Sequence, residues 1–188
     1  TLLTRLNSTD WFPAPGVVTG KPVHIGGSLG RREATARGVV CILMRALKRL
    51  RLPADGLRVA VQGFGNVGYN TALELHQSGF KVVAVSDVQG GSYSEAGLDP
   101  EQVRAHFQNG GTVAGAPGAD RITNAELIAC PCDVLVPAAL ENQIHEGNAA
   151  TVRARVVIEG ANGPTTPAAD RILEEKGIVV IPDILANA

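Results

Sequence analysis

Residues 59 to 68 read Val59-Ala60-Val61-Gln62-Gly63-Phe64-Gly65-Asn66-Val67-Gly68, and this stretch decides the fold. Its apolar first half predicts a short buried strand. Its second half has the spacing G-x-G-x-x-G, which is typical of a tight turn that leads into a helix. Gly63 permits the turn, Gly65 leaves room beside the backbone, and Gly68 lets the helix pack closely on the strand.

A carboxylate, Asp87, follows Gly68 by 19 positions, at the end of the next apolar run. The start of a helix offers N–H groups and a partial positive charge to phosphates. A carboxylate at the end of the next strand can accept hydrogen bonds from a ribose diol. The combination predicts a dinucleotide site; the alternative is a glycine-rich turn that only packs a helix on a sheet.

Length and charge narrow the class of protein. The chain has 188 residues and a formal net charge of −1, which predicts one domain, or one domain with an appendage. Nothing in this charge favours nucleic acid or an anionic membrane as a partner. We see no apolar run of membrane-spanning length and no signal peptide, so we expect a cytoplasmic location. We also expect both ends to be cut from a longer polypeptide.

The three cysteines, Cys41, Cys130 and Cys132, do not indicate a disulfide framework, because their number is odd. Cys130-Pro131-Cys132 resembles part of a metal site. A structural zinc site needs four clustered ligands, however, and the histidines are scattered along the chain. We expect no metal, and we expect this pair to be semi-buried residues that lead into a strand.

Periodicity and capping residues predict helices that alternate with strands. The expected strands cover residues 58–62, 81–86, 133–136, 156–159 and 178–181, with a turn or small hairpin at 90–91. The expected helices cover residues 32–50, 66–78, 99–109, a short segment from 123, 144–152 and 166–176. Continuous apolar strands indicate a sheet covered on both faces. The prediction is therefore a doubly wound, Rossmann-like α/β fold, an open parallel sheet that binds ligands at the carboxyl ends of its strands.

Further motifs accompany the glycine turn. They are Gly20-Lys21-Pro22, Gly26-Gly27-Ser28-Leu29-Gly30-Arg31-Arg32-Glu33-Ala34-Thr35, Val136-Pro137-Ala138-Ala139-Leu140-Glu141-Asn142-Gln143-Ile144, Glu159-Gly160-Ala161-Asn162-Gly163-Pro164-Thr165-Thr166-Pro167 and Pro182-Asp183-Ile184-Leu185-Ala186-Asn187-Ala188. Together they resemble the coenzyme-binding domain of glutamate dehydrogenase over about residues 16–188. The resemblance implies a connecting segment and loop at 1–22, an NAD-binding Rossmann-like domain at 23–188, and a substrate domain outside this chain.

The resemblance also implies a set of coenzyme contacts. The matching positions are Arg31, Thr35, Gly63, Phe64, Gly65, Asn66, Val67, Gly68, Asp87, Val88, Ala138, Ala139, Asn142, Asn162 and Asn187. Asn66 and Val67 match pyrophosphate contacts, and Asp87 matches the acid at the adenine ribose. Ala138 and Ala139 match a small-residue floor beneath the coenzyme.

The remaining matches belong to the nicotinamide end. Thr35 and Asn187 match residues near the nicotinamide, and Asn162 matches one near its ribose. Three positions keep a plainer alternative from the residues alone: Arg31 could anchor its loop, Asn66 could be an N-cap, and Asn162 could be a turn residue.

NAD is the coenzyme that these residues favour. A carboxylate at Asp87 repels a 2′-phosphate, and the four residues that follow it, 88–91, supply no cation. Members of the family that use NADP can also have an acid here, so the missing cation is the main argument. We therefore expect NAD in preference to NADP.

The resemblance places the catalytic lysine and aspartate in the preceding substrate domain, so we assign no catalytic residue. It implies a parent enzyme that converts L-glutamate to 2-oxoglutarate and ammonium with hydride transfer to NAD, and that assembles as a homo-hexamer. The chain alone should bind coenzyme without turnover. The alternatives are another amino-acid dehydrogenase of the superfamily, a non-catalytic nucleotide-binding regulatory module, or a structural domain with an empty site.

Overall fold

The chain divides into two compact units, Thr1–Ala34 and Thr35–Ala188. The computed structural model describes residues 20–187. In the first unit the short helix η2 (Val23–Ile25) is followed by the first residues of α2 (Arg31–Leu50). Gly27 is packed tightly there, because a Cβ on it would lie 1.7 Å from the carbonyl oxygen of Lys21.

The second unit is built on a seven-stranded sheet in the order β4-β3-β2-β1-β5-β6-β7. The strands are β1 (Arg58–Gln62), β2 (Lys81–Asp87), β3 (Gly90–Tyr93), β4 (Asp120–Ile122), β5 (Val134–Pro137), β6 (Val156–Ile158) and β7 (Val179–Ile181). The five strands expected from the sequence are parallel to one another. β3 and β4 are antiparallel additions at one edge, so the expected sheet is correct at its centre and incomplete at that edge.

Helices connect the strands in the doubly wound manner. After α2 come α3 (Asn66–Gln77), α4 (Pro100–Gln108), η3 (Val113–Gly115), α5 (Asn124–Ile128), η4 (Ala149–Thr151), α6 (Pro167–Glu175) and α7 (Asp183–Ala186). Asp99, Thr123 and Thr166 are N-caps whose side chains accept backbone N–H groups, as their positions before helices predicted. The α/β class is confirmed.

The helix expected over 144–152 is wrong. Ile144 instead forms a parallel bridge with Thr165, and only Ala149–Thr151 is helical. The Asn148 side chain accepts the His145 N–H at 2.8 Å and donates to the Gln143 carbonyl at 2.9 Å. An asparagine that bonds to nearby backbone groups in this way competes with helix formation.

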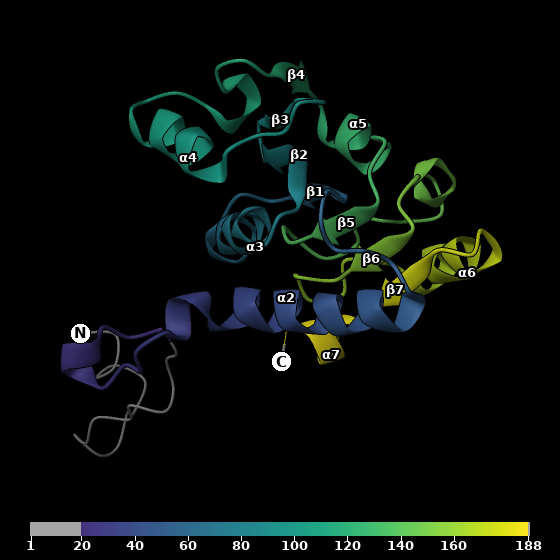
Figure 1. Ribbon diagram of the computed structural model, residues 1–188, viewed down its shortest axis with the longest axis horizontal. Coiled ribbons are helices and arrows are strands. Elements are labelled where there is room, and N and C mark those ends of the chain that lie inside the picture. Colours follow the sequence, from purple (N-terminus) through teal and green to yellow (C-terminus); the bar gives the residue numbers. More distant parts are fainter. Residues whose placement is uncertain (1–19, 188) are drawn as a thin grey trace, which may run out of the picture. The chain divides into compact units, whose positions relative to one another are not determined.

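Helices cover both faces of the sheet, with α3 and α4 on one side and α5 and α6 on the other (Figure 1). Alternate strand residues supply the two cores: Val59 and Val61 pack in the core with α2, α3 and α4, whereas Ala60 packs in the core with α5 and α6. Cys130 and Cys132 are buried in the second core, more deeply than the semi-buried positions expected.

Strand β2 has one extra residue relative to β1. Val59 pairs with Val82 but Ala60 pairs with Ala84, so Val83 is left over. This bulge puts Val83 and Ala84 in the same core, and it sets which face the end of β2 presents.

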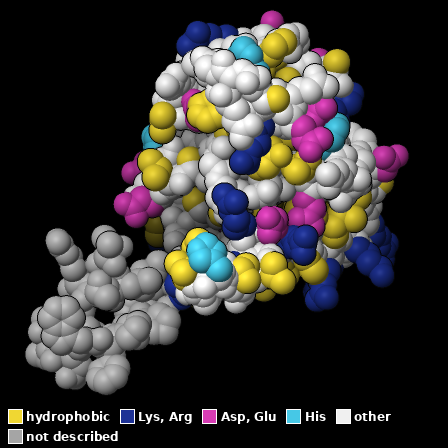
Figure 2. Space-filling model, turned by 90° about the vertical axis from the view of Figure 1, so that its left-hand side faces the viewer, with side chains coloured by type: hydrophobic (Ala, Val, Ile, Leu, Met, Phe, Trp, Pro, Cys, Tyr) yellow, Lys and Arg dark blue, Asp and Glu magenta, His cyan; other side chains and the backbone are white. Residues whose placement is uncertain are grey.

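The outer surface is chemically mixed. On the face that includes α3 and α4, basic, acidic and hydrophobic side chains are interspersed (Figure 2). Within residues 20–187, no helix has the length and apolar character needed to cross a membrane.

Candidate functional site

The sheet has a switch point between β1 and β5. From β1 the chain first adds β2 on one side and later adds β5 on the other. In open α/β sheets a ligand crevice forms at such a point, outside the carboxyl ends of the strands. Those ends lead here to Gly63 after β1 and to Ala138 after β5.

The three glycines of the turn have distinct surroundings. Gly63 has a φ of 93°, and a Cβ on it would lie 2.8 Å from the Ala138 carbonyl oxygen. A Cβ on Gly68 would lie 1.8 Å from the Gly63 carbonyl oxygen. A Cβ on Gly65 would meet nothing within 4 Å. Gly63 and Gly68 are thus needed for packing, whereas Gly65 borders open space.

Helix α3 begins at this open space. Its N-cap is Gly65, which has no side chain to bond the first N–H groups, and its first turn contains no acidic residue. Asn66 is the first helical residue, so the interpretation of Asn66 as the N-cap is wrong. A helix start without a side-chain cap directs N–H groups and a partial positive charge outward, which suits an anion.

Phe64 braces the turn through its ring. The ring packs edge-to-face on Tyr69, with centroids 5.5 Å apart, and the Arg104 guanidinium lies 4.0 Å from the centre of the Tyr69 ring. The Phe64 side chain is therefore half-buried against the core side of the turn.

Asp87 ends β2 beside the turn. It is half-buried, and its Oδ1 accepts the backbone N–H of Gln89 at 2.8 Å. Val88, the next residue, is 91% exposed. A hollow of about 450 Å³ adjoins it, lined by Val88, Gln89, Gly90, Arg121, Ile122, Thr123 and Asn124.

Arg121 is a residue that the sequence interpretation missed. Residues 88–91 supply no cation, but the pairing of β3 with β4 brings Arg121 to the same hollow as Val88 and Gln89. β4 is three residues long and contains no apolar run. Nothing local in the sequence therefore pointed to this neighbour.

The loops after β5 and β6 are packed together. The N–H groups of Gly160 and Ala161 both donate to the Pro137 carbonyl at 3.0 Å. A Cβ on Gly160 would lie 3.1 Å from the Ala138 Cβ. Ala138 is half-buried and Ala139 exposed, so the two expected floor residues lie at the surface directly after β5.

Two asparagines from distant segments meet at this side. Asn187, at the end of α7, donates from Nδ2 to Asn162 Oδ1 at 2.9 Å. Helix α7 is tied down where it begins, because the Asp183 N–H donates to the buried Glu159 carboxylate at 2.9 Å. Asp183 Oδ2 in turn accepts the Gly163 N–H at 2.7 Å. Sequence reasoning missed Glu159 and Asp183 as supports of this arrangement.

Asn142 has a left-handed backbone, with a φ of 56°, and its N–H donates to the Gly163 carbonyl at 2.9 Å. It is therefore next to the loop that holds Asn162. Thr35 lies in α2 one turn before Gly38, where a Cβ would come 3.2 Å from the Ala186 carbonyl oxygen. Arg31 belongs to the first unit, unlike the other expected contacts.

Gln62 is a further residue that the sequence interpretation missed. It is only 2% exposed at the end of β1, and its Nε2 donates to Gln143 Oε1 at 2.9 Å. Its own Oε1 is buried and has no partner in the structure. The bond ties the loop after β5 to the base of the glycine turn.

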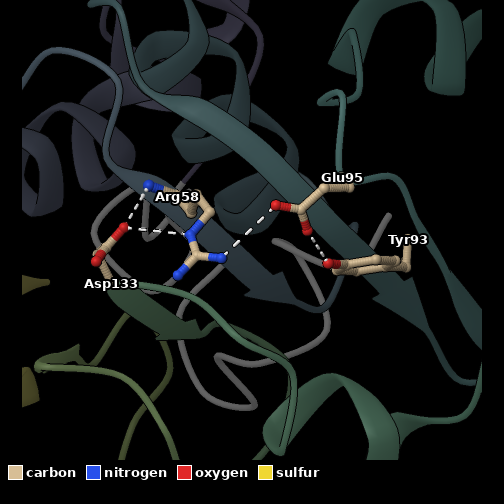
Figure 3. A network of polar contacts seen from close by, with 4 residues as sticks. All are labelled: Arg58, Tyr93, Glu95 and Asp133. Carbon is tan, nitrogen blue, oxygen red and sulfur yellow. Dashed lines mark hydrogen bonds and ion pairs between the residues drawn. The ribbon is translucent and has the colours of Figure 1, made fainter.

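The amino ends of β1 and β5, opposite the glycine turn, have a network of charged side chains. Arg58, at the start of β1, lies between Asp133 (Nε–Oδ2 3.6 Å) and Glu95 (Nη1–Oε1 3.7 Å) (Figure 3). The Arg58 N–H also donates to Asp133 Oδ2 at 2.9 Å, and the Tyr93 hydroxyl donates to Glu95. That last bond is the main reason why the pKa of Tyr93 is raised. This network joins β1, β3 and β5 at their other ends, where it supports the sheet.

The described residues include no group of three or more His, Cys, Asp or Glu side chains that could hold a metal ion. The carboxyl ends of the strands instead present backbone N–H groups, small residues, one carboxylate and several amides. Such a lining suits a ligand with phosphates and hydroxyls.

Comparisons with known proteins identify similar proteins and a family for this chain. Residues 26–188 match the family model described as Glutamate/Leucine/Phenylalanine/Valine dehydrogenase. A glutamate dehydrogenase of Thermotoga maritima is 55% identical over 174 residues, 92% of this chain and 42% of that protein. A cryptic catabolic NAD-specific glutamate dehydrogenase of Bacillus subtilis is 46% identical over 187 residues, 100% of this chain and 44% of that protein.

A solved structure is similar as well. The hetero-hexameric glutamate dehydrogenase of Thermus thermophilus, in its Leu-bound form, superposes with a TM-score of 0.84 at 39% identity. The match covers 93% of this chain and 41% of that one. The present chain thus spans less than half the length of the relatives that it matches.

Proposed function

Because the chain belongs to the Glutamate/Leucine/Phenylalanine/Valine dehydrogenase family, we propose that it is the coenzyme-binding part of an NAD-dependent glutamate dehydrogenase. In this proposal residues 35–187 bind NAD along the carboxyl ends of the strands. The substrate domain and the catalytic residues lie in the rest of the parent protein.

The observation that supports the proposal most strongly is the setting of Gly65. A Cβ there would project into open space at the uncapped start of α3, whereas the flanking Gly63 and Gly68 are closely packed. Bare backbone next to a helix start is what a pyrophosphate requires. A ribose acid, Asp87, ends the neighbouring strand.

The role of this chain is to hold and orient the coenzyme. When bound, NAD would accept the hydride that leaves the α-carbon of L-glutamate, which yields 2-oxoglutarate and ammonium. The Asn162–Asn187 pair and Thr35 would contact the nicotinamide half, and the glycine turn would bind the pyrophosphate. A parent enzyme would enclose the nicotinamide between this domain and its substrate domain, so that water is excluded.

NAD rather than NADP fits the lining near Asp87, and the Bacillus subtilis relative is named NAD-specific. Asp87 would accept the ribose hydroxyls and repel a 2′-phosphate. Arg121 would favour NADP instead, because its positively charged side chain lines the adjoining hollow and would attract a 2′-phosphate. We therefore propose a preference for NAD with measurable residual binding of NADP.

The parent assembly is proposed to be a homo-hexamer located in the cytoplasm. The support for the hexamer is the Thermus thermophilus structure, which is described as a hetero-hexamer. The assembly is expected to form largely through the other domain, so this chain alone is expected to be monomeric.

The test is a fluorescence titration of the 188-residue chain with NADH and with NADPH, with glutamate turnover assayed in parallel. We expect NADH to bind at least tenfold more tightly than NADPH, without turnover. Asp87→Ala should weaken NADH binding about 10- to 150-fold, because hydrogen bonds to a charged group are worth roughly 1.5–3 kcal/mol. The matched control is Glu175→Gln, an exposed carboxylate at the end of α6.

Turnover by this chain alone would contradict the assignment of catalysis to the rest of the protein. Equal loss of NADH affinity in the Asp87 and Glu175 variants would contradict the ribose role of Asp87.

A further inference from the structure

We propose that Asn124 is a positioning residue of the coenzyme site, which acts on the adenosine ribose through Asp87. Asn124 is the first residue of α5 and comes 37 positions after Asp87 in the sequence. The inference rests on the proposed function, because it assumes that Asp87 binds the ribose.

Two linked hydrogen bonds connect Ser86, Asn124 and Asp87. The Ser86 hydroxyl donates to Asn124 Oδ1 at 2.7 Å, and Asn124 Nδ2 donates to the Asp87 carbonyl oxygen at 2.8 Å. A carbonyl oxygen can only accept, so the amide nitrogen must face Asp87. Ser86 is fully buried, which shields its hydroxyl from competing water, whereas Asn124 and Asp87 are half-buried.

These bonds fix the peptide of Asp87 at the point where β2 ends. The next two residues, Val88 and Gln89, are exposed and form a turn. The side chain of Asp87 is held as well, because its Oδ1 accepts the Gln89 N–H at 2.8 Å. Carboxylate and carbonyl are thus both tied in place, which presents Oδ2 to a ligand in a set direction. A ligand that finds its partner preorganised binds more tightly, since less freedom is lost.

Asn124 itself is held firmly. Thr123 and Glu126 form a capping box around the start of α5, with Glu126 N to Thr123 Oγ1 at 3.2 Å and Thr123 N to Glu126 Oε2 at 2.7 Å. Leu127 and Ile128, which follow Asn124 by three and four positions and so lie on the same face of the helix, are buried and anchor α5 in the core.

Capping does not explain why an asparagine is present. Thr123 already fills the N-cap position, so the Asn124 side chain is not needed to begin the helix. Asparagine is also a weak helix former. The Asn124 side chain instead bridges α5 to β2 at Asp87, the last residue of that strand.

The test compares NADH binding by Asn124→Ala, Asp87→Ala and the double variant, each in the 188-residue chain. We expect Asn124→Ala to weaken NADH binding about tenfold in the wild-type background. In the Asp87→Ala background it should have no further effect, because it acts through that residue. Reduced nicotinamide mononucleotide, which lacks the adenosine half, should bind equally to wild type and Asn124→Ala.

Ser92→Ala is the control for a purely structural loss. The Ser92 hydroxyl also makes two buried hydrogen bonds, to the Val113 carbonyl at 2.6 Å and from the Ala116 N–H at 3.1 Å. The Ser92→Ala substitution should lower the melting temperature but leave NADH affinity unchanged. Asn124→Asp is the second variant: it keeps the size and the acceptor for Ser86, and it should also weaken NADH binding because its carboxylate faces the Asp87 carbonyl.

The outcomes separate the two proposals. If wild type binds NADH and Asp87→Ala weakens it, but both Asn124 variants bind normally, the positioning role is overturned alone. An equal loss from Asn124→Ala in both backgrounds, or a matching loss of mononucleotide binding, also overturns it. If wild type does not bind NADH, the proposed function fails, and the inference fails with it.

Discussion

Alanine at Gly65 and alanine at Gly68 should have opposite consequences, although the two residues belong to one motif three positions apart. At Gly68 the new Cβ would start 1.8 Å from the Gly63 carbonyl oxygen, whereas real Cβ contacts essentially never fall below 3.0 Å. The separation must widen by more than an ångström, and both sides of the contact are backbone. At Gly65 the new Cβ meets nothing within 4 Å.

The structure gives the expected size of each effect. Overpacking of this kind destabilises by about 1–3 kcal/mol, and the rigid backbone contact places Gly68→Ala near the upper figure. For a protein of this size, about 3 kcal/mol lowers the melting temperature by roughly 6–12 °C. At Gly65 the backbone is at φ −75° and ψ −160°, which alanine can adopt. Loss of a favourable N-cap and restriction of the unfolded chain offset each other there, so stability should stay within about 1 kcal/mol.

Binding should follow the other order. The Gly65→Ala methyl would occupy the space in which the proposed pyrophosphate meets backbone N–H groups. Loss of one hydrogen bond to a charged group, roughly 1.5–3 kcal/mol, weakens NADH binding about 10- to 150-fold. Gly65→Ala should therefore be folded but defective in binding.

Thermal melts followed by circular dichroism and NADH fluorescence titrations would measure both quantities. Wild-type NADH affinity in Gly65→Ala would refute the location of the pyrophosphate. An unchanged melting temperature in Gly68→Ala would refute the packing argument for that glycine.

Three further predictions concern other parts of the site and its supports. Arg121→Gln should weaken NADPH binding severalfold and NADH binding little in paired titrations, because Arg121 lines the hollow beside Val88; equal losses would contradict this role. Glu159→Ala should speed hydrogen exchange at the Asp183 N–H, which loses its acceptor, whereas Glu159→Gln should retain protection; similar exchange in both variants would count against it. Hydrogen bonds from the Thr123 N–H and hydroxyl lower the pKa of Glu126. The stabilising effect of this carboxylate is therefore present above its unfolded pKa and lost as pH falls through the folded one. The difference in melting temperature between wild type and Glu126→Gln should shrink on acidification below about pH 4, and a difference that persists at pH 2 would contradict the capping role.

Local signals made much of this fold predictable. The parallel strands are continuous apolar runs, and Asp99, Thr123 and Thr166 each occupy a position where an N-cap serves the helix directly after it. The glycine turn was predictable because the spacing of its three glycines matches the turn, the open space and the close packing that the backbone requires there. Such features depend on residues close together in the chain.

What the sequence could not reveal depends on pairing between distant segments. β3 has the sequence G-G-S-Y and β4 has D-R-I, and neither contains an apolar run. Their pairing defines them instead: β3 pairs with β2, and β4 pairs with β3. Arg121 reaches the hollow, and Asn124 reaches Asp87, through that same pairing. α7 is only four residues long and is held by Glu159 from another loop.

The extra residue in β2 has a consequence for how this site tolerates change. Side chains alternate along a strand, so every position after Val83 is shifted in phase by the bulge. As a result Ser86 is directed to α5, and Asp87, by alternation, to the opposite face. Deleting one valine from β2 would exchange the two, sending the hydroxyl toward α3 and the carboxylate toward α5. A substitution in this strand thus changes one side chain, whereas a change in its length by a single residue exchanges the faces of the residues that follow.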